Sequence, residues 1–194
     1  LFLSRMSTDE QSLIASCQSG TLTDFDPLYR QYVKQIYAFI YRRTLVTQTA
    51  EDITSVTFMR ALEKIHLYAP SKGPFVAWLY SIARNCIADH YRAAREVKNI
   101  DDVWDLSSSE DIEHGTHSKV AFEKLQAALH TLDKDKRDIV MLRLWEGLSY
   151  AEIAAVTGKS EGNCKVIFCR TIDTLRTQLP ALTYLLLLLF PSVL

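Results

Sequence analysis

The chain contains little glycine, proline or cysteine, and its charges nearly cancel. Its 194 residues include six Gly and five Pro, which excludes a collagen-like chain and a Pro/Gly-rich disordered chain. Its four cysteines include no Cys-x-x-Cys pair, so we expect reduced thiols in a cytoplasmic protein and interpret Cys164 and Cys169 as small buried hydrophobic residues. The net charge of −1 does not by itself indicate a polyanion partner.

Long hydrophobic runs and catalytic motifs are missing as well. The Leu-rich segment 182–190 (LTYLLLLLF) is nine residues long, whereas a helix needs about 20 to span a bilayer. It is either a short helix packed on its own module or a docking segment for a partner or membrane surface. No nucleophile–base pair, Gly-rich phosphate loop or dense metal cluster is visible. The sequence therefore predicts no enzyme, no cofactor, no metal and no small-molecule substrate.

The near-zero net charge hides a strong segregation of charge along the chain. Residues 1–29 carry −3, residues 30–98 carry +6, residues 99–118 carry −6 and residues 119–194 carry +2. Such blocks indicate two modules joined by a flexible acidic linker. The first module has the charge to bind a polyanion even though the whole chain is nearly neutral.

Apolar residues recur at helical spacing and show no strand-like alternation, so we predict an all-α fold of two small helical domains. Four helices are expected in the first domain, at about 8–19, from 26, from 49 and over 75–97. Four more are expected in the second domain, over about 119–132, at 135–145, from 150 and over 160–179. The predicted domains are 7–98 and 119–180, with the linker at 99–118 and a tail at 181–194.

The helix expected over 75–97 has two distinct stripes. One is apolar and should be buried: Phe75, Leu79, Ile82 and Cys86. The other mixes rings with basic groups and has few acids: Tyr80, Arg84, Ile87, Tyr91 and Arg95, flanked by Trp78, Asn85 and Arg92. Rings can stack on unpaired bases while arginine neutralises phosphate. The alternative is a solvated basic face with tyrosines packed sideways.

A short helix, a glycine-containing turn and a longer helix follow one another near the C-terminus. Ser149 and Glu152 have the spacing of a capping box, and Ser160 can cap the next helix after the turn at Gly158. This order is typical of a DNA-binding helix-turn-helix. A generic helical hairpin is the alternative.

Four stretches in this order resemble the extracytoplasmic-function sigma factors of bacterial RNA polymerase, in the sigma-70 family. They are FDPLYRQYVKQIYAFIYRR (25–43), AEDITSVTFMRALEKI (50–65), FVAWLYSIARNCIADHYR (75–92) and LSYAEIAAVTGKSEGNCKVIFCR (148–170). The resemblance implies that the first three form region two, a helical bundle, and that the last lies in region four, a helix-turn-helix.

The resemblance also implies three sets of site residues. The polymerase-binding set is Glu51, Asp52, Phe58 and Arg60. With loop 66–74, the set that melts the −10 promoter element and traps its bases is Trp78, Tyr80, Arg84, Asn85, Tyr91, Arg92 and Arg95. The set that reads the −35 element is Ser160, Asn163, Lys165, Ile167 and Arg170. The recognition helix departs from the family with Val166-Ile167, where Ser-Arg is common.

The partners implied are the polymerase core, through its beta-prime clamp and beta flap, promoter DNA, and an anti-sigma protein, which in this family is often membrane-bound. Two other functions remain open at this point. One is a helix-turn-helix transcriptional regulator that never melts DNA. The other is a helical adaptor that binds no DNA and whose tail docks on a membrane partner. That function leaves both the helix-turn-helix and the charge segregation unexplained.

Overall fold

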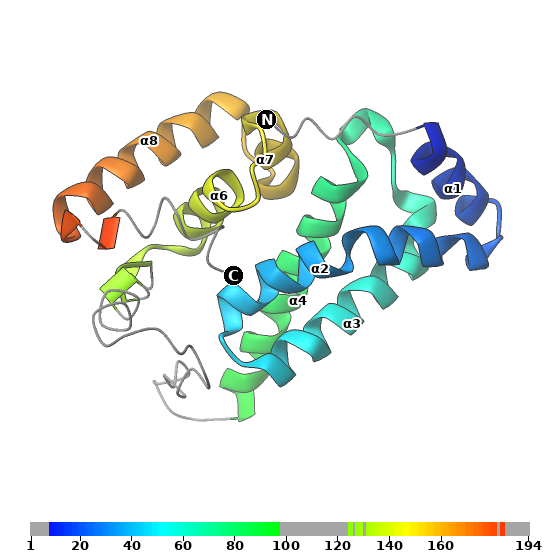
Figure 1. Ribbon diagram of the computed structural model, residues 1–194, viewed down its shortest axis with the longest axis horizontal. Coiled ribbons are helices and arrows are strands. Elements are labelled where there is room, and N and C mark those ends of the chain that lie inside the picture. The colour runs from blue at the N-terminus through cyan, green and yellow to red at the C-terminus, as the bar shows by residue number, and fades with distance from the viewer. Residues whose placement is uncertain (1–7, 98–123, 126, 130, 182, 185–194) are drawn as a thin grey trace. The chain divides into compact units, whose positions relative to one another are not determined.

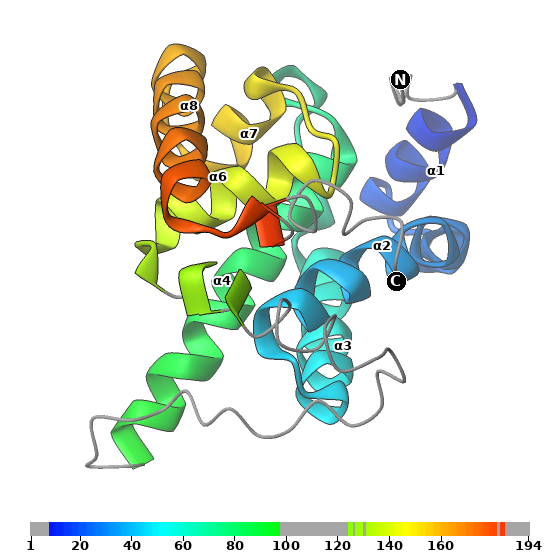
Figure 2. The same cartoon turned by 60° about the vertical axis from the view of Figure 1, so that its left-hand side comes forward.

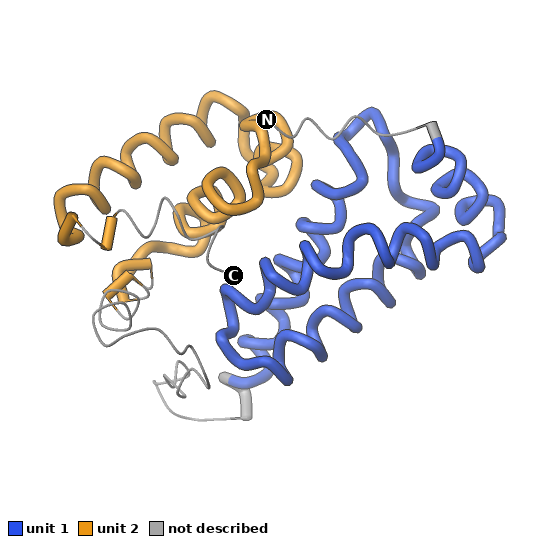
Figure 3. Tube along the Cα trace, viewed as in Figure 1, with its two compact units in different colours: residues 1–109 blue, residues 110–194 orange. Residues whose placement is uncertain are grey.

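The computed structural model describes residues 8–97, 124–125, 127–129, 131–181 and 183–184. Within these ranges all regular structure is helical and no strand occurs, which confirms the predicted all-α fold. The chain divides into two compact units, residues 1–109 and 110–194 (Figure 3). The acidic linker expected at 99–118, and most of the tail expected at 181–194, lie outside the described residues.

In residues 8–97, the described part of unit 1, the chain forms four α-helices: α1 (Thr8–Gln18), α2 (Phe25–Thr44), α3 (Thr47–Lys64) and α4 (Phe75–Val97). Short 3-10 turns precede α2 and link α3 to α4: η1 (Leu22–Asp24), η2 (Ile65–Leu67) and η3 (Pro70–Lys72). Helices α2 and α3 run side by side, and α4 contacts both (Figures 1 and 2). Helix α1 packs on α2 and on η2.

The core of unit 1 forms because these helices bury apolar side chains at helical spacing. Helix α2 contributes a fully buried row at Leu28, Ile36, Phe39 and Ile40. Helix α4 buries the predicted stripe Phe75, Leu79, Ile82 and Cys86. Since α4 meets both α2 and α3, more than one of its faces is covered.

The corner between α2 and α3 needs a left-handed residue. Leu45 supplies it with φ 56°, and its backbone N–H donates to the Tyr41 carbonyl at 2.7 Å. This bond satisfies a carbonyl at the end of α2. The chain can then enter α3 after a single extended residue, Val46.

Unit 2 contains α6 (Lys134–Leu144), α7 (Tyr150–Thr157) and α8 (Glu161–Gln178), and the three helices contact one another. Its core includes Val140, Met141 and Trp145 from the α6 segment, together with Leu175 of α8. Helical residues Leu125 and Leu129 complete this cluster from the segment before α6.

Candidate polymerase and nucleic-acid interfaces

The outer face of α3 carries two of the four residues expected to bind polymerase. Glu51 and Asp52 are exposed in the second turn of α3, which begins at Thr47. Val56 and Met59 lie on the same helix with 39% and 60% of their surfaces exposed. This face therefore combines acidic and apolar groups, a composition suited to a protein partner.

Phe58, which was expected on the polymerase-binding surface, belongs to the core instead. Only 4% of its surface is exposed. Its ring packs edge-on against Tyr29 and Phe25 of α2, with centroids 4.9 and 6.4 Å away. The expectation that Phe58 lies on the exposed surface of α3 is wrong, because its side of the helix faces α2.

Arg60, the fourth residue of that set, is joined to α4 by an ion pair. Its Nη1 lies 2.7 Å from Oδ2 of Asp89, and the other oxygen of Asp89 lies 3.2 Å from Nη1 of Arg92. The hydrogen bond to Asp89 raises the pKa of the Arg60 guanidinium. Asp89, which the sequence did not indicate as a site residue, thus lies between Arg60 of the expected polymerase-binding set and Arg92 of the expected −10 set.

Tyr80 was expected to present its ring to DNA, but its side chain is fully buried. The ring packs edge-on against Phe39 at 5.0 Å, and its hydroxyl accepts a hydrogen bond from Gln35 Nε2 at 2.8 Å. Ile87 of the same stripe is also buried, with 3% exposed. The prediction of one exposed stripe through Tyr80 and Ile87 is wrong, because α2 packs against this side of α4.

Tyr91 and Arg84, two further members of that stripe, are partly buried. The Tyr91 hydroxyl donates to the Arg43 carbonyl at the end of α2, at 3.2 Å. Because the Tyr91 side chain is half-buried, only part of it is accessible to a ligand. Arg95 lies at the end of α4, where the side chains are outside the described residues.

The exposed stripe of α4 runs instead through the residues first regarded as flanking. Asn85 and Arg92 are exposed, and Trp78 and Ser81 are half-exposed. Residues 78, 81, 85 and 92 are separated by three, four and seven positions, which places them on one helical face. Trp78 packs against Tyr68 and Phe75, at centroid distances of 5.5 and 5.4 Å.

The loop between α3 and α4 lies beside this stripe in the sequence and contacts it through Tyr68. Leu67 has 61% of its surface exposed, and His66 and Lys72 are exposed as well. Together with Trp78, the loop offers apolar, aromatic and cationic groups. Unpaired bases bind to such groups by stacking, and phosphates by charge.

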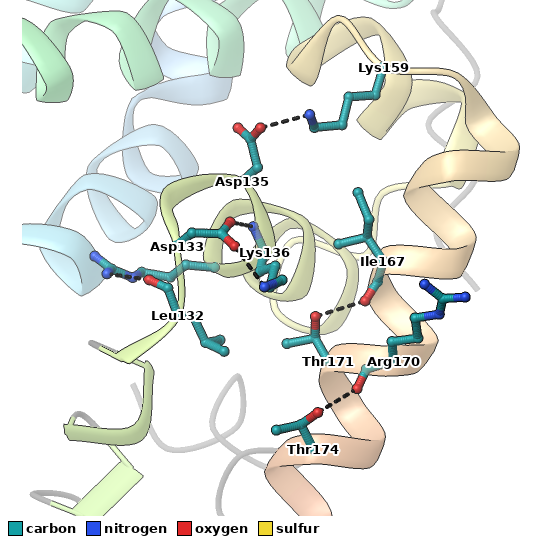
Figure 4. Close-up of polar contacts among 10 residues, drawn as sticks. Leu132, Asp133, Asp135, Lys136, Lys159, Ile167, Arg170, Thr171 and Thr174 are labelled. Atoms are coloured by element: carbon teal, nitrogen blue, oxygen red, sulfur yellow. Dashed lines mark hydrogen bonds and ion pairs between the residues drawn. The ribbon is translucent and has the colours of Figure 1, made fainter.

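In unit 2 the expected helix-turn-helix geometry is present. The capping box at Ser149 and Glu152 is confirmed, because each side chain bonds the other residue's backbone N–H. Helix α7 ends at Gly158, whose φ of 72° favours glycine, and Ser160 then caps α8 by accepting from the Asn163 N–H. An ion pair of 2.7 Å joins Lys159 of the turn to Asp135 of α6 (Figure 4).

The recognition helix α8 exposes most of the residues assigned to the −35 element. Asn163, Lys165 and Arg170 are exposed, whereas Ile167 is half-buried. The Ser160 hydroxyl is engaged as the helix cap. Within the helix, the Thr171 hydroxyl donates to the Ile167 carbonyl at 2.7 Å (Figure 4).

The centre of this exposed face carries two residues that the sequence analysis did not select. Val166 has 46% of its surface exposed, and Cys169 is exposed whereas Cys164 is buried. The interpretation of Cys169 as a buried residue is therefore wrong. Five positions turn an α-helix by about 140° past a full turn, so the two cysteines point in different directions and only Cys164 meets the core. Val166 was recognised only as a departure from the family pattern.

The described part of the chain contains neither a metal-binding cluster nor a helix able to cross a membrane. No group of three or more His, Cys, Asp or Glu residues there is placed to hold a metal ion. Among those same residues, no helix has both the length and the hydropathy that crossing a bilayer requires.

One unit is a helical bundle whose α4 exposes aromatic, amide and basic side chains, and the other contains a helix-turn-helix, which defines a class of all-α protein with two helical units. The family description "Sigma-70 region 2" matches residues 28–97, and "Sigma-70, region 4" matches residues 122–175. The sigma factor SigM of Bacillus subtilis is 30% identical over 152 residues, which cover 78% of this chain and 92% of SigM. The chain belongs to the extracytoplasmic-function sigma factors of the sigma-70 family, and the resemblance seen in the sequence is confirmed.

Other relatives and solved structures agree with this assignment. BldN of Streptomyces coelicolor is 36% identical over 172 residues, 87% of this chain. The chain spans 65% of the length of BldN, and 65% of the relative SigE of Mycolicibacterium smegmatis. The sigma factor RpoE of Bartonella quintana, solved with the anti-sigma factor NepR, has a TM-score of 0.64 and 26% identity, covering 79% of this chain and 95% of RpoE. CnrH, solved with the cytosolic domain of CnrY, has a TM-score of 0.66 at 21% identity over 88% of this chain and 96% of CnrH, and shows the same fold.

Proposed function

We propose that this chain is a transcription initiation factor that binds the RNA polymerase core and directs it to specific promoters. Unit 1 melts the −10 element and holds its unpaired bases, and unit 2 reads the −35 element as duplex. Residues 7–98 and 119–180 are the two functional domains, joined by the acidic linker 99–118. Membership of the sigma factor family supports this assignment.

The observation that carries the proposal is a second candidate DNA surface outside the helix-turn-helix. Trp78, Asn85 and Arg92 share one exposed face of α4. An aromatic ring gains about 1–3 kcal/mol by stacking on an unpaired base, whereas a duplex keeps its bases stacked on each other. A regulator that reads only duplex DNA has no use for such a face. The exposed face of α4 therefore disfavours the alternative function of a duplex-binding regulator.

The polymerase-binding assignment is narrower than the sequence implied. Glu51 and Asp52 remain candidates because their carboxylates are exposed on α3, and we add Met59, which is 60% exposed beside them. Phe58 supports this surface from within the core, and Arg60 joins α3 to α4. We assign neither of them a direct contact.

On the recognition helix, Asn163 and Arg170 are the best-placed readers of duplex DNA. Both are exposed, with Lys165 at one edge of the same surface for a phosphate. The exposed Val166 suits the methyl group of thymine, since apolar contact is how that group is read in the major groove. Ile167 is half-buried and contributes mainly to the packing of α8.

An anti-sigma protein completes the proposed set of partners, because the similar RpoE was solved bound to the anti-sigma factor NepR. We assign the protein to the cytoplasm, where polymerase and promoter DNA are found. It acts through binding alone and catalyses no reaction of its own.

The test is promoter opening by the full chain with core polymerase on host promoter fragments, read as permanganate reactivity of thymines in the −10 element. Asn85→Ala should reduce this reactivity about tenfold, since a base contact contributes about 1–3 kcal/mol, without weakening core binding. Asn163→Ala is the matched control in the other unit. It should weaken binding to the duplex promoter but leave opening of the bound complex unchanged.

Two outcomes would decide against the proposal. If wild-type protein with core enzyme leaves every promoter unreactive, the protein is a duplex-binding regulator. If Asn85→Ala lowers core binding as much as promoter opening, the exposed face of α4 belongs to the polymerase interface.

A further inference from the structure

Helix α1 lies outside residues 28–97, the part that matches the region 2 description, yet it contacts the loop next to the proposed strand-binding face. The contact is made by the last residue of the helix. Gln18 Nε2 donates to the carbonyl of Ile65 and to the carbonyl of Tyr68, both at 2.9 Å. One side-chain amide therefore fixes two backbone groups at the start of the loop, and it uses both of its N–H donors.

Tyr68 connects the start of the loop to the end of the loop and to α4. Its side chain is 5% exposed, and its hydroxyl donates to the Gly73 carbonyl at 3.1 Å. Its ring packs edge-on against Phe75 at 5.3 Å, and it contacts the Trp78 ring in a tilted arrangement at 5.5 Å. The loop is thus held at its start by Gln18 and near its end by Tyr68.

The other end of α1 is fixed to the same group of rings. Glu10 is buried, and its Oε1 accepts a hydrogen bond from the Tyr32 hydroxyl at 2.9 Å. The Tyr32 ring in turn contacts Phe75 at 5.8 Å. Glu10 and Gln18 thus connect both ends of α1 to the loop and to the rings packed against it. We call α1 the brace of the loop because of these two connections.

What α1 braces is the exposed part of the proposed strand-binding surface. Leu67 lies between the two carbonyls that Gln18 binds, and 61% of its surface is exposed. Such a side chain buries little of itself in the protein, so its position depends on the backbone that carries it. The backbone on either side is held by Gln18.

We propose that Gln18 is a positioning residue for capture of the −10 strand, and that α1 is a functional part of the strand-binding unit. The proposal rests on the proposed function and extends it to a helix outside the matched region. Fixing the loop before the strand arrives removes an ordering cost from the capture step. Loss of the brace should therefore weaken promoter opening and base discrimination, with core binding unaffected.

The test compares Gln18→Leu with Gln11→Leu in the full chain with core polymerase. Leucine keeps much of the side-chain size and removes both donors, and Gln11 is an exposed glutamine of the same helix. We expect Gln18→Leu to lower the open-complex equilibrium on a duplex promoter about tenfold, because two hydrogen bonds are lost. The ratio between the best −10 base and a substituted base should fall as well. Gln11→Leu should stay within about twofold of wild type on both measures.

A second variant distinguishes loss of the loop restraint from a general folding defect. Tyr68→Phe removes only the bond to Gly73 and should lower opening in the same direction, with core binding at the wild-type level. If Gln18→Leu opens promoters and discriminates bases like wild type, the proposal is overturned. It is also overturned if core binding falls as much as opening. Failure of the proposed function looks different, because the wild-type protein would then open no promoter.

Discussion

Replacing Asp89 with asparagine should weaken the fold and strengthen DNA binding at the same time. The Asp89 carboxylate lies 2.7 Å from Arg60 and 3.2 Å from Arg92, in side chains that are 43%, 38% and 69% exposed. Ion pairs this open to solvent contribute about 0.2–1 kcal/mol each. Asp89→Asn should therefore cost at most about 2 kcal/mol of unfolding free energy.

The effect on DNA has the opposite sign because the same carboxylate neutralises arginine on the proposed strand-binding face. Arg92 is the more exposed of the two, and without Asp89 it is free to meet a phosphate. One added phosphate contact on a single strand steepens the dependence of log K on log salt by about 0.7. Extrapolated from 1 M salt, this corresponds to about fivefold tighter binding at 0.1 M.

The assay is binding of holoenzyme to promoter fragments with a pre-melted −10 element, measured at several salt concentrations. Asp26→Asn is the matched control, because Asp26 forms an exposed 2.7 Å pair with Arg30 on α2. It should cost less stability, because Asp26 forms one such pair and Asp89 forms two, and it should leave the salt slope unchanged. A salt slope for Asp89→Asn equal to that of wild type would refute the reasoning, since Arg92 would then not meet the strand.

Three further predictions depend on which side chains are buried and which are exposed. Phe58→Ala should lower the unfolding free energy of unit 1 by about 3–5 kcal/mol, because it removes a buried ring. Thermal unfolding measures this, and an unchanged melting temperature would contradict the burial of Phe58. Burial raises the pKa of Glu10. The stability that its protonated form provides is therefore complete below the pKa of the unfolded state, near 4.5, and is lost as pH rises through the pKa of the folded state. Glu10→Gln should flatten this decline of the unfolding free energy, as measured by denaturant titrations at several pH values. Asp52→Arg should abolish core binding in a pull-down by reversing an exposed charge on α3, and wild-type binding would rule Asp52 out as a contact.

Local features were predictable from the sequence because they depend on neighbours along the chain. The capping residues Ser149 and Ser160 and the glycine at position 158 act within a few residues, and they fixed the helix-turn-helix. The apolar stripe from Phe75 to Cys86 likewise required only helical periodicity. The segregation of charge likewise predicted two modules, because it depends only on the order of residues along the chain.

Helical periodicity alone does not predict which aromatic side chains of α4 are buried and which are exposed. Tyr80 and Trp78 are both aromatic and two positions apart, and a tyrosine can be buried when its hydroxyl finds a partner such as Gln35. Whether such a partner exists depends on α2, which is distant in the sequence. The same holds for Phe58, whose surroundings are Phe25 and Tyr29.

The amino-acid sequence by itself determined the helices, their caps and the family, since short-range spacing and composition encode these. Only the tertiary structure decided which rings are exposed, that Asp89 lies between Arg60 and Arg92, and that Gln18 binds a loop 47 and 50 residues away. The physical reason is that burial and long-range hydrogen bonds depend on how helices pack. A side chain of one type then serves the core or the surface according to the neighbour that packing provides.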